Sequence, residues 1–321
     1  MGQYVCMSRR VRFHGIAHFP WDIPVGPETL GMVERIKLGS NVCMIALPVA
    51  SSGMAGTQLL APLDYRGKPL AQPLLSSSAG QWGYTASATL CYLSAARISF
   101  LLNPTANVAA SAEFKDLGDA FLKWFEVIRE WAAAWSHQPL RTIGEPRGSV
   151  LYVPTGGGLM AGSGARAGSV FVGAAPLTDT QLRGAFRCAS RDEHLPVEHR
   201  LLLSAQVAHM GGDFRLAVID AGSAAEVGLA TAISDELRLK GVDSEFIERA
   251  LVDANGVVGL AALYAALGRT LPVSKNRVAS ELAQIRNTAA HGGRIPTEAE
   301  AERALQHSRA LVQAARPLPP L

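Results

Sequence analysis

The residues best suited to chemistry stand together near the C-terminal end of the chain. The run from Gln284 to His291 gathers Arg286, Asn287 and His291 into the end of one apolar helix, and two glycines follow at once. A guanidinium is a permanent cation that holds phosphate, and an imidazole exchanges a proton near neutral pH. These are the groups needed to cleave a phosphodiester without a metal ion.

Helix geometry restricts how these groups can meet. Asn287 and His291 are four residues apart and share a face, whereas Arg286 and His291 are five apart and point about 140° away from each other on a regular helix. Two features could bring them together. Gly292 and Gly293 permit the helix to unwind at His291, or a second copy of the chain could supply the missing group across a two-fold interface. The second option predicts a dimer with its cleft between paired helical bundles.

Residues 196–315, which must position this turn, read as an all-α bundle. Pro196 suits a first helical turn, Gly211 ends that helix, and Asp213 caps the next. The helix predicted over residues 274–290 carries a buried stripe of Val278, Leu282, Ile285 and Ala289. The last helix opens with a capping box at Thr297. Short connections predict an antiparallel bundle, followed by a proline-rich tail at residues 316–321.

Residues 1–190 have a different pattern, so the predicted fold class is α+β. Strand-like segments at residues 11–13, 42–47 and 88–102 alternate with turn residues, and a hairpin with a glycine-rich tip is predicted over residues 148–174. Between them, residues 113–136 form a helix with an aromatic stripe that should pack on the sheet. A shorter helix should begin at Thr178, and residues 191–195 read as a linker. This β-rich domain carries no catalytic constellation, and we expect it to regulate or target the bundle.

The bundle resembles the HEPN superfamily, whose nucleases carry an arginine, a polar residue and a histidine near a helix end. The motif maps onto Arg286, Asn287 and His291, and the resemblance covers about residues 196–315. The segment from Arg215 to Gly228 is similar to the long preceding helix of such proteins and offers Glu226 as a partner across the cleft.

The resemblance implies a metal-independent endoribonuclease, often a toxin or an anti-phage defence effector, that leaves a 2′,3′-cyclic phosphate and a 5′-hydroxyl. His291 would move the proton, Arg286 would hold the phosphate, and Asn287 would orient His291 or the phosphate. The implied partners are RNA, a second copy of the chain, and a regulatory protein or antitoxin. No cofactor and no metal are implied.

Charge provides only a local signal for RNA. The whole chain carries a formal net charge of +3, and the part from Pro196 onward holds 13 Lys and Arg against 14 Asp and Glu, a net −1. An RNA-binding patch must therefore be local. The candidates are the cations around the motif, Arg269, Lys275, Arg277 and Arg294. The alternative is a solvated helix edge.

The sequence does not support several other classes of protein, such as zinc-binding, membrane or nucleotide-hydrolysing proteins. Cys6, Cys43, Cys91 and Cys188 are widely separated, which argues against zinc and, without a signal peptide, favours reduced thiols in the cytoplasm. No uninterrupted apolar span predicts a membrane helix. A cluster around His194 and His199 could bind a divalent metal or could be a polar linker. No Walker, Rossmann or nucleophile-elbow motif is present.

A non-catalytic interpretation stays open. Arg286 and His291 could simply serve the carbonyls and the dipole at a helix C-terminus. The bundle would then be a nucleotide- or RNA-binding module, or a protein-interaction module.

Overall fold

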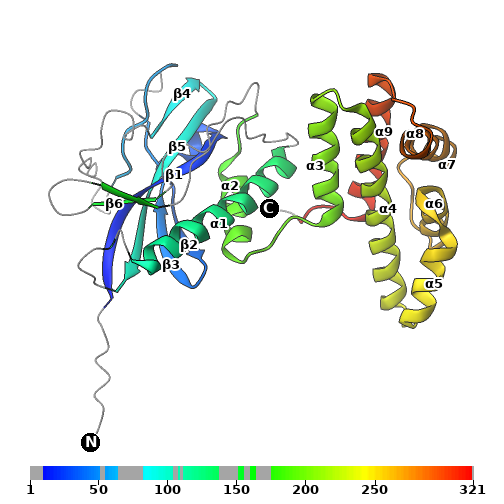
Figure 1. Cartoon of the computed structure of the whole chain (residues 1–321), viewed down its shortest axis with the longest axis horizontal. Coiled ribbons are helices and arrows are strands. Elements are labelled where there is room, and N and C mark those ends of the chain that lie inside the picture. The colour runs from blue at the N-terminus through cyan, green and yellow to red at the C-terminus, as the bar shows by residue number, and fades with distance from the viewer. Residues whose placement is uncertain are drawn as a thin grey trace, which may run out of the picture. The chain divides into compact units, whose positions relative to one another are not determined.

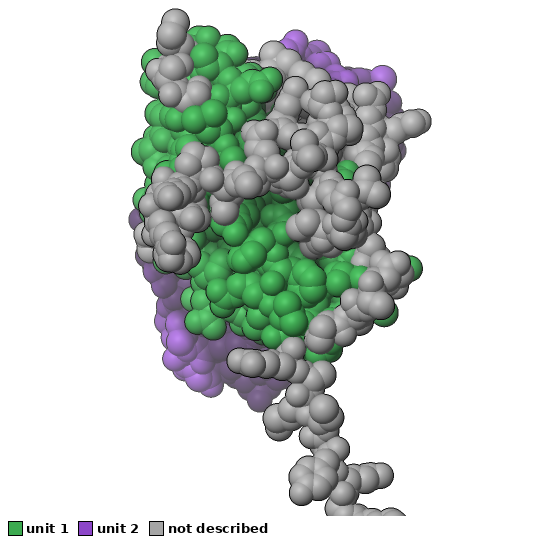
Figure 2. All heavy atoms as spheres, turned by 90° about the vertical axis from the view of Figure 1, so that its left-hand side faces the viewer, with its two compact units in different colours: residues 1–194, 321 green, residues 195–320 purple. Residues whose placement is uncertain are grey.

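A computed structural model of the chain describes residues 10–50, 55–63, 82–103, 108, 111–136, 151–154, 160–163 and 175–319. The chain divides into two compact units, unit 1 up to His194 and unit 2 from Leu195 to Pro320 (Figure 2). In the described residues, unit 1 is an antiparallel sheet with two α-helices and one short 3-10 helix, and unit 2 is entirely helical (Figure 1), so the fold is α+β, as predicted.

The sheet of unit 1 is built around two long strands, β1 (Val11–Val25) and β5 (Leu90–Leu102), which pair along most of their length. The strand order is β2-β3-β5-β1-β6-β7, and β4 also pairs with β5. The shorter strands are β2 (Val33–Leu38), β3 (Asn41–Ala46), β4 (Gly83–Ser87), β6 (Leu151–Pro154) and β7 (Met160–Ser163). Strands β6 and β7 pair as a hairpin. The second strand of this hairpin lies at residues 160–163, inside the predicted glycine-rich tip, so the prediction of a tip without strands was wrong. Residues 164–174 of the predicted hairpin and Cys6 lie outside the described residues.

Both described helices of unit 1 pack on one face of this sheet. Helix α1 (Ala112–Ser136) runs across the strands (Figure 1), and its buried aromatic stripe meets buried rings of β1 and β5. Phe125 stacks on Phe19 at 5.5 Å between ring centroids, and Phe114 stacks on Phe100 at 6.3 Å. Helix α2 (Asp179–Ser190) begins at the predicted cap Thr178 and packs beside α1. The aromatic helix is thus core, as its periodicity indicated.

Unit 2 is a bundle in which α3 (Val197–Met210), α4 (Phe214–Leu239) and α9 (Glu298–Ala315) run alongside one another (Figure 1). Two short helices, α5 (Ser244–Ala254) and α6 (Gly256–Ala266), follow α4. The predicted caps Asp213 and Thr297 both accept the expected backbone hydrogen bonds. Pro196 and Gly211 flank α3 as predicted.

The motif lies at the end of one helical segment that has three parts. A turn of α7 (Lys275–Arg277) leads into a π-helical stretch, Val278–Ala283, and then into α8 (Gln284–His291). The sequence predicted one regular helix here. The predicted stripe of Val278, Leu282, Ile285 and Ala289 is buried. The same residues therefore face the core although the π-helical stretch has a wider turn than a regular α-helix. Local π segments of this kind occur often at functional sites.

Helix α4 forms the centre of the bundle. By length and composition alone it could cross a membrane, but half of its most apolar window is buried inside the protein, where a core helix has the same composition. Its small residues allow close approach, because a Cβ at Gly228 would lie 3.3 Å from Val312 Cγ2 of α9. The apolarity of α4 therefore serves the core of unit 2.

Candidate active site

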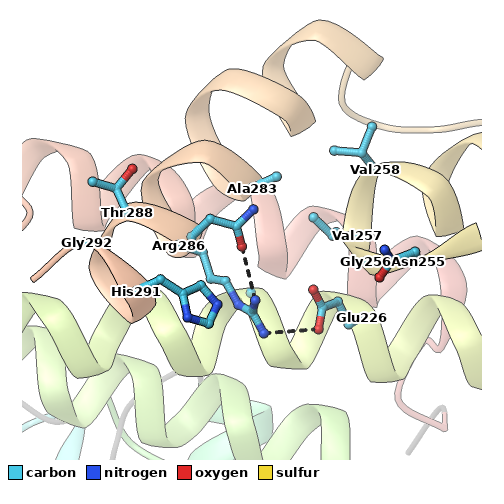
Figure 3. A pocket seen from close by; sticks show the side chains of 12 residues that line it. Glu226, Asn255, Gly256, Val257, Val258, Ala283, Arg286, Thr288, His291 and Gly292 are labelled. Atoms are coloured by element: carbon cyan, nitrogen blue, oxygen red, sulfur yellow. Dashed lines mark hydrogen bonds and ion pairs between the residues drawn. The ribbon is translucent and has the colours of Figure 1, made fainter.

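A cleft of about 940 Å³ opens in unit 2 between α4, the α5–α6 junction and α8. Arg286, Asn287 and His291 all line it, and Glu226 faces them from α4 (Figure 3). The rest of the lining comes from small residues and from the turn between α5 and α6, namely Gly222, Asn255, Gly256, Val257, Val258, Ala283, Thr288 and Gly292. The motif residues and Glu226 thus share one cavity within a single chain.

Arg286 is held by polar contacts at its tip and by packing along its stem. Its Nη1 donates to Asn287 Oδ1 at 3.1 Å, and its Nη2 lies 3.5 Å from Glu226 Oε2. The stem crosses α4 at Gly222, where an added Cβ would lie 2.8 Å from Arg286 Cγ. Within the described part of the chain, Arg286 Nε is buried without a hydrogen-bond partner. The guanidinium is therefore positioned, but one of its donors lacks an acceptor.

His291 occupies the last turn of α8 and is exposed to solvent. Its ring lies on the side of α8 that faces α4, as does the guanidinium of Arg286 (Figure 3). Among the described residues it has no hydrogen-bonded partner. An exposed imidazole with free ring nitrogens can accept or donate a proton.

The helix does not unwind at His291, so the first of the two alternatives is not the one the structure adopts. Gly292 keeps a right-handed helical conformation and donates its N–H to Thr288 O at 2.9 Å, so α8 stays regular through His291. The chain turns one residue later, at Gly293, whose φ of +66° suits glycine. Arg215 Nε also donates to Ala289 O at 3.0 Å and caps this end. Arg286 and His291 therefore share the cleft because both project toward α4, not because the helix is broken.

The turn between α5 and α6 forms one wall of the cleft, which was not predicted from the sequence. Asn255 has a positive φ of 32°, which is uncommon for a residue with a side chain, and Gly256 has a φ of +75°. A Cβ at Gly256 would lie 3.8 Å from Glu226 Oε1, so the turn closes around the carboxylate. The Asn-Gly pair in the sequence was the available signal, because it marks a tight turn.

None of the four cations proposed to bind RNA lines this cleft. Arg269 pairs with Glu236 at the far end of α4, and Arg294 pairs with Glu300 at 2.7 Å. Lys275 and Arg277 belong to the turn of α7, one helical segment away from the motif. Glu236 becomes a neighbour of Arg269 only through folding, because 33 residues separate them in the sequence.

Unit 2 holds two further polar clusters away from the cleft. His307 Nε2 lies 2.6 Å from Glu281 Oε2, and this hydrogen bond lowers the pKa of Glu281. Arg316, the first residue of the expected tail, contacts Glu198 at 3.2 Å and Asp235 at 2.8 Å, and its carbonyl accepts from His199. Among the described residues no group of three or more His, Cys, Asp or Glu is arranged to hold a metal ion.

Comparison with known proteins finds no matching family model, no matching curated protein and no matching solved structure. The chemistry of the cleft must therefore be inferred from its own residues. A guanidinium, an imidazole, an amide and a carboxylate in one open cavity can bind an oxyanion and transfer a proton beside it.

Proposed function

We propose that the chain is a metal-independent endoribonuclease of the HEPN type. The observation that carries the proposal is the convergence of Arg286 and His291, five residues apart on a regular helix, on one solvent-open cleft. Arg286 would bind the scissile phosphate and stabilise the extra charge of the transition state. His291 would take the proton of the ribose 2′-hydroxyl or give one to the leaving 5′-oxygen.

The other cleft residues support this arrangement of roles. Asn287 and Glu226 hold the guanidinium of Arg286 from two sides. Each terminal nitrogen of Arg286 keeps a second N–H beyond these contacts, and an incoming phosphate oxygen would accept from it. The products would be a 2′,3′-cyclic phosphate and a 5′-hydroxyl, and the need for a 2′-hydroxyl would exclude DNA.

One cleft offers a single guanidinium and a single imidazole, whereas an in-line displacement is served best by two proton-transfer groups. A homodimer would double the set across a two-fold axis. Unit 2 exposes large apolar side chains that such an interface could cover, among them Phe246, Val252 and Ile295. We propose a homodimeric, cytoplasmic enzyme of the toxin or anti-phage kind, held in check by a regulatory protein or antitoxin.

A second candidate function is a non-catalytic nucleotide- or RNA-binding or protein-interaction module. This function is favoured by the contacts that Arg286 already makes inside the protein. Its two terminal nitrogens contact Asn287 and Glu226. A phosphate must compete with the Glu226 carboxylate for the guanidinium. If it does not, the cleft is a structural ion pair beside an exposed histidine.

The deciding experiment is cleavage of total RNA in EDTA by the purified chain and by His291→Ala. The enzyme should cut RNA without a divalent ion and leave cyclic phosphate ends, and the variant should be about 10²–10⁴-fold slower. His209→Ala, which changes a histidine outside the cleft, is the matched control and should retain full activity. Equal rates for His291→Ala and the unchanged chain would leave the binding module as the better description.

A further inference from the structure

The face of the unit 1 sheet opposite α1 and α2 carries no helix among the described residues. Its side chains are exposed near Arg12 and Arg35 and buried at Ile16 and His18. Successive side chains of a strand point to opposite faces of the sheet. Phe13, Ile36 and Ile45 point toward α1 and α2, so the residues directly before and after each of them point to the opposite face. On that face, four residues from neighbouring strands lie side by side in one row, because each is paired with the next across the sheet. They are Arg35, Met44, Ser99 and His14. We call the surface around this row the open face.

The open face is positively charged. Arg12 and Arg35 are exposed on it, and Arg97 lies half-buried beside His14. The carboxylates of the strands concerned point elsewhere. Glu34 alternates to the helix-covered face and pairs with Arg183 of α2, and Asp22 lies past the register shift in β1. The pKa of His14 is lowered by burial and then by Arg97 and Arg12, as expected in a positive local potential.

Exposed apolar side chains stand between these cations. Val42 is 47% exposed and Met44 is 42% exposed on β3, and Leu101 of β5 is 38% exposed opposite Arg12. Apolar and cationic side chains thus alternate across this face. Such a mixture suits a ligand that has both phosphates and base faces.

We propose that the open face binds single-stranded RNA, with Arg12 and Arg35 on the phosphates and Val42, Met44 and Leu101 against the bases. The charge of the face selects a polyanion, and the choice of RNA among polyanions rests on the proposed function of unit 2. The role of this site is to capture the strand, not to cut it.

Charge reversal on the full chain tests this proposal. Arg12→Glu combined with Arg35→Glu changes two exposed cations of the open face. Lys115→Glu combined with Arg187→Glu makes the same change of charge on the helical side of unit 1, where both residues are exposed. Each pair is built in a His291→Ala background, so that cleavage does not consume the ligand.

Binding is measured by fluorescence anisotropy with a labelled single-stranded RNA of about a dozen nucleotides, in EDTA, over a series of salt concentrations. We expect the open-face pair to weaken binding about tenfold or more and to flatten the salt dependence, because phosphate contacts release counterions. The helical-side pair should bind like its parent, and Arg12→Lys with Arg35→Lys should restore most of the affinity.

Equal affinity for the open-face pair and its parent would overturn the proposal, as would an equal loss in the helical-side pair. Binding to anionic phospholipid vesicles without binding to RNA would also overturn it. The outcome is separate from that of the proposed nuclease activity. RNA binding that depends on the open face can be found in a chain that cuts nothing, and cleavage that depends on His291 can be found in a chain whose open face binds nothing.

Discussion

At the scale of single residues, the cleft depends on a glycine as much as on the charged groups. Gly222 lets the stem of Arg286 lie directly on α4, since even a methyl group there would meet Arg286 Cγ at 2.8 Å. Glycine inside a helix is less stable than alanine by roughly 1 kcal/mol. This loss of helix stability accompanies the close placement of Arg286 on α4.

Gly222→Ala should separate activity from stability. The added methyl would displace Arg286 from its contacts with Glu226 and Asn287, so cleavage should fall about tenfold or more, a loss of transition-state stabilisation of about 1.4 kcal/mol. Thermal unfolding should fall less than cleavage does, because the helix preference of alanine offsets part of the cost of the clash with the Arg286 stem. Gly228→Ala is the control, since its methyl would meet Val312 at 3.3 Å, away from the cleft, and should affect unfolding more than cleavage. Full activity in Gly222→Ala would show that the position of the arginine stem is unimportant.

At the scale of secondary-structure elements, the bundle is tied together where α9 ends. His199 on α3 is buried and donates from Nε2 to Arg316 O at 2.8 Å, and Arg316 reaches Glu198 of α3 and Asp235 of α4. The residue expected to begin a tail instead links three helices. Burial is the main cause of the lowered pKa of His199, although its bond to Arg316 acts in the opposite direction.

This lowered pKa predicts that the bundle weakens in mild acid. A group whose pKa is depressed in the folded state contributes stability that is present above its unfolded pKa of about 6.5 and is lost as pH falls toward the folded value. The melting temperature should therefore drop between about pH 7.5 and about pH 5.5. His199→Gln keeps a side-chain donor for Arg316 O but does not titrate, so its melting temperature should drop less. An identical pH dependence in the two proteins would assign the effect to other groups, such as His14.

At the scale of the whole molecule, two compact units divide the work that we propose. Unit 1 carries 17 Lys and Arg against 13 Asp and Glu, a net +4, and unit 2 carries a net −1. The excess of positive charge is in unit 1, which contains the sheet, whereas the candidate catalytic residues are in the nearly neutral helical bundle of unit 2. This division favours capture of RNA by one unit and cleavage by the other.

A fragment of residues 195–320 should show this division directly. It contains the whole hydrophobic core of unit 2, so we expect it to fold and to cut RNA with the same end groups as the full chain. It should lose the full chain's choice among RNA substrates, measured by sequencing the cleavage sites of both proteins. If the fragment and the full chain cut the same sites equally well, unit 1 has no targeting role.

The sequence by itself determined the local elements of this protein, because their signals lie within a few residues of one another. The caps at Asp213, Thr178 and Thr297, the aromatic stripe of α1, and the apolar stripe around Leu282 were all readable from spacing. Strand β2 was missed, since its alternation is short and rich in charged residues.

Only the tertiary structure decided which distant residues meet. Gly222 packs on the stem of Arg286 from 64 positions away, and Glu236 removes Arg269 from the expected RNA-binding patch from 33 positions away. Glu226 was expected opposite the motif only through the family resemblance. The open face likewise exists only through the pairing of four strands. Such contacts depend on how helices and strands pack and not on neighbouring residues, so no local pattern encodes them.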